Sequence, residues 1–120
     1  MPDVPARPRI VCLCGSLRFG RELEAERARL TLDLAIVLAP EVTASTELEP
    51  TLVRALGELH LRRIDLADEV RIINPGGYIG EATRREIAYA DASGKRITYV
   101  HEPWLGGSTA SAPGPRRTRA

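Results

Sequence analysis

The sequence predicts a small α/β domain with a doubly wound, mostly parallel sheet of four to five strands and helices on both faces, of the Rossmann or flavodoxin type. Short runs rich in β-formers alternate along the chain with amphipathic helical stretches, a pattern typical of parallel strands covered by helices. The chain has 120 residues and 43% hydrophobic content, enough to bury one core but not two. We therefore expect a single domain with right-handed crossovers between its strands.

Four segments have the composition of strands, namely 9–16, 35–42, 68–74 and 96–100. Cys12 and Cys14 alternate within the first segment, so both thiols are expected on one face of the strand. A C-x-C pair without further Cys or His ligands has poor spacing for zinc. We interpret the two cysteines as buried structural thiols and expect no metal site.

Three helices are expected between and after these strands, over residues 19–34, 50–66 and 81–93. The second begins at about Pro50, a favoured first helical residue, and Gly94 stops the third. The apolar residues of the first helix fall near one face, and they are Phe19, Leu23, Leu30 and Leu34. Each helix therefore has a side that can cover a sheet.

Both ends of the chain differ in composition from the expected domain, residues 9–105. Residues 1–8 contain three prolines and are predicted to be flexible. Residues 106–120 are rich in Gly, Ser and Pro and end in basic residues, a composition that buries too little apolar surface to become ordered. We predict that this basic tail is disordered.

Charge and hydropathy narrow the classes of partner. Seventeen Lys and Arg against sixteen Asp and Glu give a net charge of +1, without the positive excess of a general nucleic-acid binder. No apolar run approaches the roughly 18–20 residues of a membrane span, and the start of the chain lacks the apolar core of a signal peptide. We expect a cytoplasmic protein that binds a small molecule and neither nucleic acid nor membrane.

The loop after the first expected strand has the composition of a phosphate site. In doubly wound domains, ligands bind outside the carboxyl ends of the strands. Gly15 permits a tight turn, and Ser16, Arg18 and the free N–H groups of a helix start suit an anion. The alternative is a Ser N-cap beside a solvated Arg, and the motif is not a Walker loop.

His60 is expected on the inward face of the second helix. It shares a stripe with small or apolar residues, which are Val53, Leu56, Gly57, Ile64 and Ala67. A histidine in this position is either a hydrogen-bonded core residue or a functional group. Asp65 and Asp68 follow His60 along the chain. They are either part of the same functional site or simply the residues that end the helix.

Glu86 falls on the apolar side of the third helix, together with Ala82, Thr83, Ile87, Tyr89 and Ala90. A buried carboxylate is costly unless it is paired, and proteins keep such groups mostly where they have a use. The structural alternative is a pair of Glu86 with Arg18 or with His60. Glu81, at the start of the same helix, has an ordinary explanation in the helix dipole.

Several short motifs occur in a characteristic order. They are C-G-S-L-R at 14–18, I-D-x-A-D-x-V at 64–70, a Gly-rich loop, and R-E-I-A-Y-A-D-A-S-G-K-R-I at 85–97. This order resembles the nucleoside 2-deoxyribosyltransferase superfamily, and it is similar also to the hydrolytic branch, the (deoxy)nucleoside 5′-monophosphate N-glycosidases. The resemblance covers about residues 9–102 and rests on the order and spacing of the motifs.

The resemblance implies roles for particular residues. The catalytic glutamate of the superfamily falls on Glu86. The phosphate-binding motif of the hydrolytic branch falls on Gly15, Ser16, Leu17 and Arg18. The transferases do not have the arginine of this motif. The residues before and at the start of the third helix are expected to contact the substrate, and they are Gly77, Tyr78, Gly80 and Thr83.

Two positions depart from the superfamily's pattern. Residues 82–85 replace the small-residue turn before the glutamate, and the loop glycines lie earlier, so Glu81 becomes a second candidate carboxylate. An aspartate of the superfamily aligns with His60. His60, Asp65 and Glu81 are therefore the candidates for the acid or the orienting group beside the leaving base.

The expected activity is hydrolysis of the N-glycosidic bond of a (deoxy)nucleoside 5′-monophosphate to free base and (deoxy)ribose 5-phosphate, without metal or cofactor. The alternatives are a deoxyribosyltransferase that exchanges bases and a non-catalytic nucleotide-binding module. A folded core of this size can hardly enclose a nucleotide, so a homodimer or larger homo-oligomer is expected.

Overall fold

The computed structural model describes residues 2–40 and 47–101. Within these ranges, the strands are β1 (Ile10–Cys14), β2 (Ile36–Leu38), β3 (Glu69–Ile72) and β4 (Arg96–Tyr99), all of them parallel. The helices are α1 (Gly20–Leu32), α2 (Pro50–Leu66) and α3 (Glu81–Ala92), with short 3₁₀ turns at Leu17–Phe19 and Pro75–Gly77. The predicted α/β class is confirmed.

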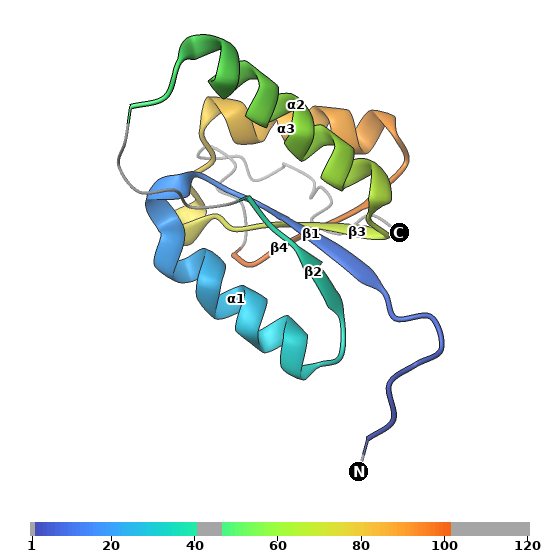
Figure 1. Ribbon diagram of the computed structural model, residues 1–120. Coiled ribbons are helices and arrows are strands. Elements are labelled where there is room, and N and C mark those ends of the chain that lie inside the picture. The colour runs from blue at the N-terminus through green and yellow to red at the C-terminus, as the bar shows by residue number, and fades with distance from the viewer. Residues whose placement is uncertain (1, 41–46, 102–120) are drawn as a thin grey trace, which may run out of the picture.

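The order of the strands across the sheet is β2-β1-β3-β4. The chain moves outward from β1 to β2 and then returns to the other side of β1 to add β3 and β4. α1 covers one face of the sheet, and α2 and α3 cover the other (Figure 1). The reversal makes the carboxyl ends of β1 and β3 the switch point at which ligands bind in doubly wound sheets.

The sheet separates two hydrophobic clusters. On the side of α2 and α3, the buried residues are Cys12, Cys14, Ile64, Ala67, Val70, Ile72, Ala90 and Ile97. On the side of α1, they are Val11, Leu13, Leu23, Leu30, Ala35 and Ile73. Alternate residues of β1 enter alternate clusters, so the prediction that the two cysteines share one face is confirmed.

A buried ionic network ties α1 to the sheet. Glu26 on α1 is 8% exposed, and it accepts a 2.6 Å hydrogen bond from Arg71 Nε on β3 and a further bond from Arg29. Burial raises the pKa of Glu26, but the hydrogen bonds from the two guanidinium groups outweigh it and leave that pKa lowered. Thr98 joins the network by accepting from Arg71 and donating to Glu69.

Two helix ends show how the chain turns. Gly94 follows α3 with φ of +74° and ends that helix, as predicted. Leu34 occupies the same left-handed region, at +65°, one residue after Asp33, whose N–H closes the last turn of α1. The prediction that Leu34 belongs to the helix is therefore wrong, because the chain has already turned toward β2.

The strands are shorter than the predicted runs. β1 ends at Cys14 because Gly15 and Ser16 begin the loop, and β2 ends at Leu38. Residues 2–8 form no helix or strand. The predicted basic tail, 106–120, lies outside the described residues, as do residues 41–42 of the second predicted strand and the last four residues of the predicted domain.

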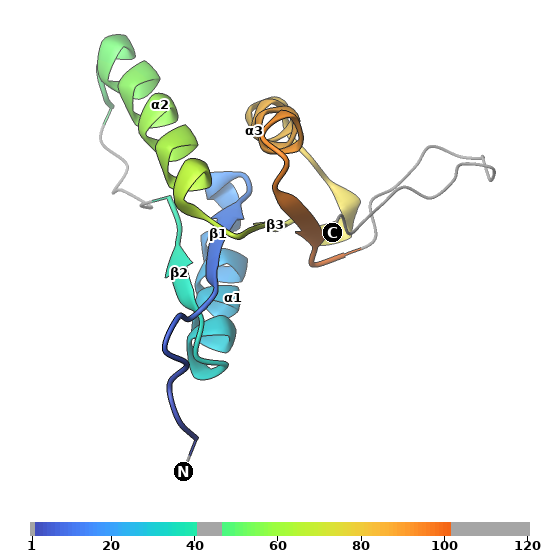
Figure 2. The ribbon, with the colours of Figure 1, turned by 90° about the vertical axis from the view of Figure 1, so that its right-hand side faces the viewer.

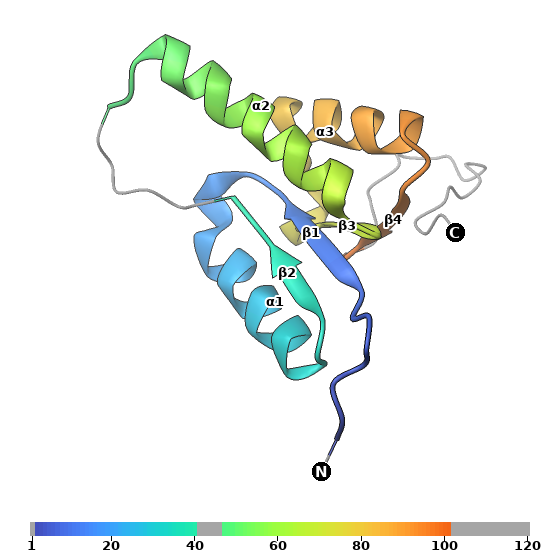
Figure 3. The same ribbon diagram turned by 45° about the vertical axis from the view of Figure 1, so that its right-hand side comes forward.

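α2 is buried only in its second half. His60 and Ile64 are 4% and 0% exposed, whereas Val53 and Leu56 are 52% and 39% exposed. Figures 2 and 3 show the amino-terminal half of α2 extending past the sheet. A helix of this length spans about 26 Å, and a five-residue strand only about 17 Å, so the first turns have no strand beneath them. The inward stripe is confirmed only from His60 onward.

None of the helices in the described ranges is both long and apolar enough to cross a membrane. The compartment of the protein stays a prediction.

Candidate active site

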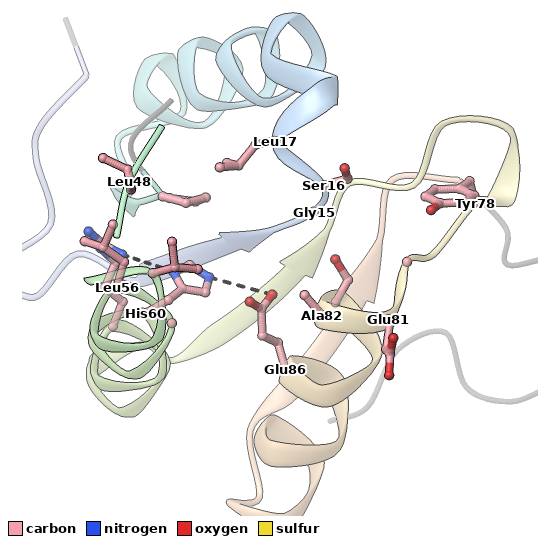
Figure 4. A pocket seen from close by; sticks show the side chains of 16 residues that line it. Gly15, Ser16, Leu17, Leu48, Leu56, His60, Tyr78, Glu81, Ala82 and Glu86 are labelled. Atoms are coloured by element: carbon pink, nitrogen blue, oxygen red, sulfur yellow. Dashed lines mark hydrogen bonds and ion pairs between the residues drawn. The ribbon is translucent and has the colours of Figure 1, made fainter. Parts of the chain in front are cut away.

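A pocket of about 520 Å³ lies at the carboxyl ends of β1 and β3 (Figure 4). Its walls are the loop after β1, one side of α2, and the start of α3 with the loop before it. The lining residues are Gly15, Ser16, Leu17, Pro40, Leu48, Val53, Leu56, Gly57, His60, Arg63, Tyr78, Gly80, Glu81, Ala82, Thr83 and Glu86. The pocket therefore occupies the switch point of the sheet, and its volume suits a small organic ligand.

Glu86 points into this pocket from the second turn of α3 (Figure 4). Its side chain is 19% exposed, and its Oε1 lies 4.0 Å from His60 Nε2. Burial raises the pKa of Glu86, and the nearby imidazole opposes this effect. The predicted inward orientation of Glu86 is confirmed, and of the two partners considered for it, the structure brings His60 beside it.

His60 faces Glu86 from α2, and a neighbouring residue determines which ring nitrogen carries the proton. His60 Nδ1 lies 3.2 Å from Arg63 Nη1. A guanidinium can only donate hydrogen bonds, so Nδ1 accepts, and the proton of the neutral ring is assigned to Nε2. Nε2 is the nitrogen that faces Glu86, as the dashed line in Figure 4 marks. His60 therefore presents an N–H donor toward the floor of the pocket.

Two buried thiols lie beside the His60 ring. His60 Nε2 is 3.3 Å from Cys14 Sγ and 3.9 Å from Cys12 Sγ, and neither cysteine is exposed. The hydrogen bond with Cys14 lowers the pKa of Cys12 to about 6, against the effect of burial. The same contact, together with burial, raises the pKa of Cys14. The pair therefore holds one thiolate more readily than two.

Gly15 allows the loop after β1 to pass close to the end of β3. A Cβ on Gly15 would lie 2.9 Å from both the Cβ and the carbonyl oxygen of Ile73. Any side chain at this position would therefore push the two chain segments apart. The glycine lets backbone, rather than a side chain, form this wall of the pocket.

The predicted phosphate loop lies only partly in the pocket. The three residues before Arg18 line it, and Ser16 Oγ accepts a 3.4 Å hydrogen bond from the Arg18 N–H as the cap of the 3₁₀ turn. The guanidinium carbon of Arg18 lies 4.5 Å from the centre of the Tyr78 ring and 5.4 Å from that of Phe19. Arg18 is not among the lining residues. The N-cap accounts for Ser16, and phosphate recognition by Arg18 stays a prediction.

The two other candidate carboxylates lie away from the pocket floor. Glu81 lines the rim, but its side chain is 87% exposed and pairs with Arg85 at 3.5 Å. Asp65 is not a lining residue. It accepts a 2.6 Å hydrogen bond from the Tyr89 hydroxyl and pairs with Arg62 at 3.1 Å. The structure does not bring Asp65 to the site, because its carboxylate is held by Tyr89 of α3 and by Arg62.

Three of the four residues predicted to contact a substrate before and within α3 line the pocket. They are Tyr78, Gly80 and Thr83, whereas Gly77 does not line it. Gly77 takes φ of +83°, in the turn that leads to Tyr78. Its part in the site is to shape the loop.

Apart from His60, the residues of the α2 wall were not expected as part of a site. The lining residues that were not candidates are Pro40, Leu48, Val53, Leu56, Gly57, Arg63 and Ala82. The signal for Arg63 was its position three residues after His60, which places it on the same side of the helix. The signal for Val53 and Leu56 was the length of the apolar stripe on α2, which extends further along the helix than a short strand can cover.

No family model matches the chain, and no curated protein sequence matches it. The resemblance to nucleoside 2-deoxyribosyltransferases therefore rests on the motifs given above, and the activity that it implies is a proposal.

Proposed function

We propose that the protein is an N-glycosidase that hydrolyses a (deoxy)nucleoside 5′-monophosphate to free base and (deoxy)ribose 5-phosphate. The observation that carries the proposal is that Glu86 and His60 face each other in the pocket, with 4.0 Å between Glu86 Oε1 and His60 Nε2. Cleavage of a C1′–N bond passes through an oxocarbenium-like sugar. It needs a carboxylate beneath C1′ and a hydrogen-bond donor at the departing base.

Each step of this reaction has a candidate group. Glu86 attacks C1′ or stabilises its positive charge. The electron pair of the C1′–N bond leaves with the base, and His60 stabilises it by a hydrogen bond from Nε2–H to the base nitrogen. Water then attacks C1′, displacing Glu86 where that carboxylate has bonded to it; its hydroxyl stays on C1′ and its proton completes the free base. Arg63 supports this role because it holds Nδ1 as an acceptor.

The rest of the pocket is compatible with a nucleotide. The apolar wall of Val53 and Leu56 suits the flat face of a base. The loop at Gly15 and Ser16 offers backbone N–H groups to an anion. We therefore assign the base to the side of α2 and the 5′-phosphate to the loop after β1.

Deoxyribosyl transfer between bases is the second candidate. The observation that favours it is the position of Arg18, which stacks on Tyr78 and Phe19 and does not line the pocket. Without a phosphate-binding arginine, a free nucleoside is as suitable a substrate as a nucleotide.

A panel of substrates separates these activities. Purified protein is incubated with nucleoside monophosphates and the matching nucleosides, with and without a second free base, and products are followed by chromatography. Hydrolysis releases base from monophosphates in the absence of an acceptor, whereas transfer produces a new nucleoside only when the acceptor is present. Nucleotide binding with no product in any reaction contradicts both activities and supports the non-catalytic module.

Glu86→Gln tests the role of the carboxylate. We expect the variant to bind nucleotide and to lose turnover by at least about 10²-fold, as happens when a positioned catalytic group is removed. Glu81→Gln is the matched control, because Glu81 is exposed and paired with Arg85. Full activity of Glu86→Gln with an inactive Glu81→Gln would transfer the role to Glu81.

A further inference from the structure

Four side chains of metal-ligating type converge beneath the pocket, and the proposed hydrolysis uses only two of them. The ligand atoms of Cys12, Cys14 and His60 lie within 4.8 Å of one another, and all three residues are buried. Glu86 Oε1 lies 4.0 Å from His60 Nε2. The groups come from β1, α2 and α3, which explains why the C-x-C pair looked isolated in the sequence. The fold supplies the ligands that the local sequence lacks.

The distances from His60 Nε2 to the other three ligand atoms come close to those around a tetrahedral ion. Bonds of about 2.3 Å from zinc to sulfur and about 2.0–2.1 Å to nitrogen or oxygen place neighbouring ligand atoms about 3.3–3.8 Å apart. His60 Nε2 is 3.3 Å from Cys14 Sγ, 3.9 Å from Cys12 Sγ and 4.0 Å from Glu86 Oε1. Shifts of a few tenths of an ångström would bring the two sulfur separations into that range, whereas Glu86 must turn its carboxylate further toward the ion.

The donor set favours one class of cation. Magnesium and calcium prefer oxygen ligands, whereas two thiolates with an imidazole and a carboxylate suit zinc and its thiophilic substitutes. Two thiolates and one carboxylate carry one negative charge more than a divalent ion neutralises. A bound divalent ion would therefore leave one net negative charge at the site.

We propose that Cys12, Cys14 and His60 form a binding site for a thiophilic divalent cation, with Zn²⁺ as its natural class, and that Glu86 completes the ligand set by turning toward the ion. The ion enters from the pocket, because His60 and Glu86 line it and the thiols lie behind them. This inference does not depend on the proposed hydrolysis, since every group in it is identified by its own position and chemistry. A bound ion would engage the two groups that the hydrolysis uses, so ion binding should inhibit that reaction.

Arg63 regulates access to the imidazole. When Nε2 binds a cation, the ring proton lies on Nδ1 and faces the donor groups of Arg63. The guanidinium must then turn away, and it has room to do so because Arg63 is half-buried and lines the pocket. Arg63→Gln removes this conflict, because the amide oxygen of Gln can accept from Nδ1–H. We expect that variant to bind the cation more tightly than the wild type.

Cobalt provides a direct spectroscopic test on the full chain, in reducing buffer and without substrate. One equivalent of Co²⁺ should produce the thiolate-to-cobalt charge-transfer absorption and the visible bands of a tetrahedral ion, and Zn²⁺ should remove both by displacement. Zn²⁺ should also protect both thiols of the wild-type protein from alkylation. Saturation without a charge-transfer band, or thiols that alkylate equally fast with and without Zn²⁺, would overturn the proposal.

Variants locate the ion. Loss of an outer hydrogen-bond partner lowers the affinity of a metal site by about 10–100-fold. His60→Gln and Cys14→Ser each remove a ligand and should weaken Co²⁺ binding by more than that. His101→Gln is the matched control, because His101 is the other histidine of the chain. Circular dichroism checks that each variant is folded, and thiol protection in the wild type decides the question where a cysteine variant is not. Equal affinity in His60→Gln and the wild type contradicts the site.

Discussion

His60 takes its chemical state from the residue three positions after it. Arg63 cannot accept a hydrogen bond, so its approach to Nδ1 leaves the proton on the nitrogen that faces Glu86. An N–H donor and a half-buried carboxylate thereby face the same space. The arrangement depends on a side chain that would otherwise be read as an ordinary solvated arginine.

The first prediction concerns the donor. His60→Asn should lower turnover of the proposed hydrolysis by about 10²–10⁴-fold, because the shorter amide does not place an N–H where Nε2 lies. Base release in the presence of a metal chelator measures the loss. Asp65→Asn should keep wild-type turnover, since Asp65 pairs with Arg62 and Tyr89 outside the pocket. Equal losses in the two variants would reassign the donor role.

At the scale of secondary-structure elements, the attachment of α1 to the sheet is sensitive to acid. The pKa of Glu26 in the folded protein is below its ordinary value of 4.5. The ionised carboxylate therefore stabilises the fold above pH 4.5, and this contribution is lost as the pH falls through the lowered pKa.

Glu26→Gln tests this second prediction. At neutral pH the variant should lose about 1.5–3 kcal/mol of unfolding free energy, the usual contribution of hydrogen bonds to charged groups. The difference from the wild type should shrink as the pH falls below 4.5, and urea unfolding at several pH values measures it. Glu24→Gln is the control, because the Glu24 carboxylate is exposed and its ion pair with Arg27 lies on the surface, where such pairs contribute little to stability. A difference that stays constant with pH would contradict the assignment.

The third prediction concerns Gly15, where the loop after β1 passes close to Ile73 at the end of β3. Gly15→Ala should lower the unfolding free energy by about 1–3 kcal/mol, because the new methyl group overlaps Ile73. Gly57→Ala is the opposite control. Among the described residues, no atom outside the chain neighbours and nearby helix backbone of Gly57 lies within 4 Å of a Cβ built there, so alanine in this helix should stabilise the fold by about 0.5–1 kcal/mol. Thermal unfolding of the two variants should move in opposite directions.

At the scale of the whole molecule, the first half of α2 presents apolar side chains to solvent. Leu52, Val53, Leu56 and Leu59 are 46%, 52%, 39% and 47% exposed. An apolar strip of this kind is typical of a surface that contacts another protein. The predicted homo-oligomer therefore has a natural contact surface beside the pocket.

The fourth prediction is that the protein is a homodimer or larger in solution, and that Leu59→Glu dissociates it. A charge on the strip would be desolvated in the interface. Light scattering at assay concentration measures the mass, and Leu66→Glu, at the other end of α2, should leave the oligomer intact. A wild-type monomer that is fully active would contradict this prediction.

The sequence was sufficient for the order and type of the elements, because each strand run and each helix has a clear period and clear ends. Pro50 and Gly94 mark helix boundaries by their own backbone chemistry, and the structure has them there. Leu34 was misassigned because its apolar side chain continues the period of α1, whereas its left-handed backbone cannot be read from the residue type.

The site was only partly predictable. Glu86 and His60 were recognisable as polar residues on apolar helix faces, and those faces meet in the pocket. Asp65 does not line the pocket and bonds Tyr89 and Arg62 instead, because helix periodicity does not say which neighbour a side chain will bond. The convergence of Cys12, Cys14 and His60 was invisible in the sequence, because it depends on α2 crossing the sheet above β1.

The sheet divides the polar groups of the domain into two independent sets. His60 and Glu86 lie on the side of α2 and α3, whereas Glu26 and Arg71 lie on the side of α1. No side chain of one set contacts the other in the interactions given above, so substitutions in the two sets should have additive effects. Residues that face the pocket can therefore change during evolution without disturbing the network of Glu26 and Arg71. That network continues to stabilise the fold and offsets the stability that changes at the pocket lose.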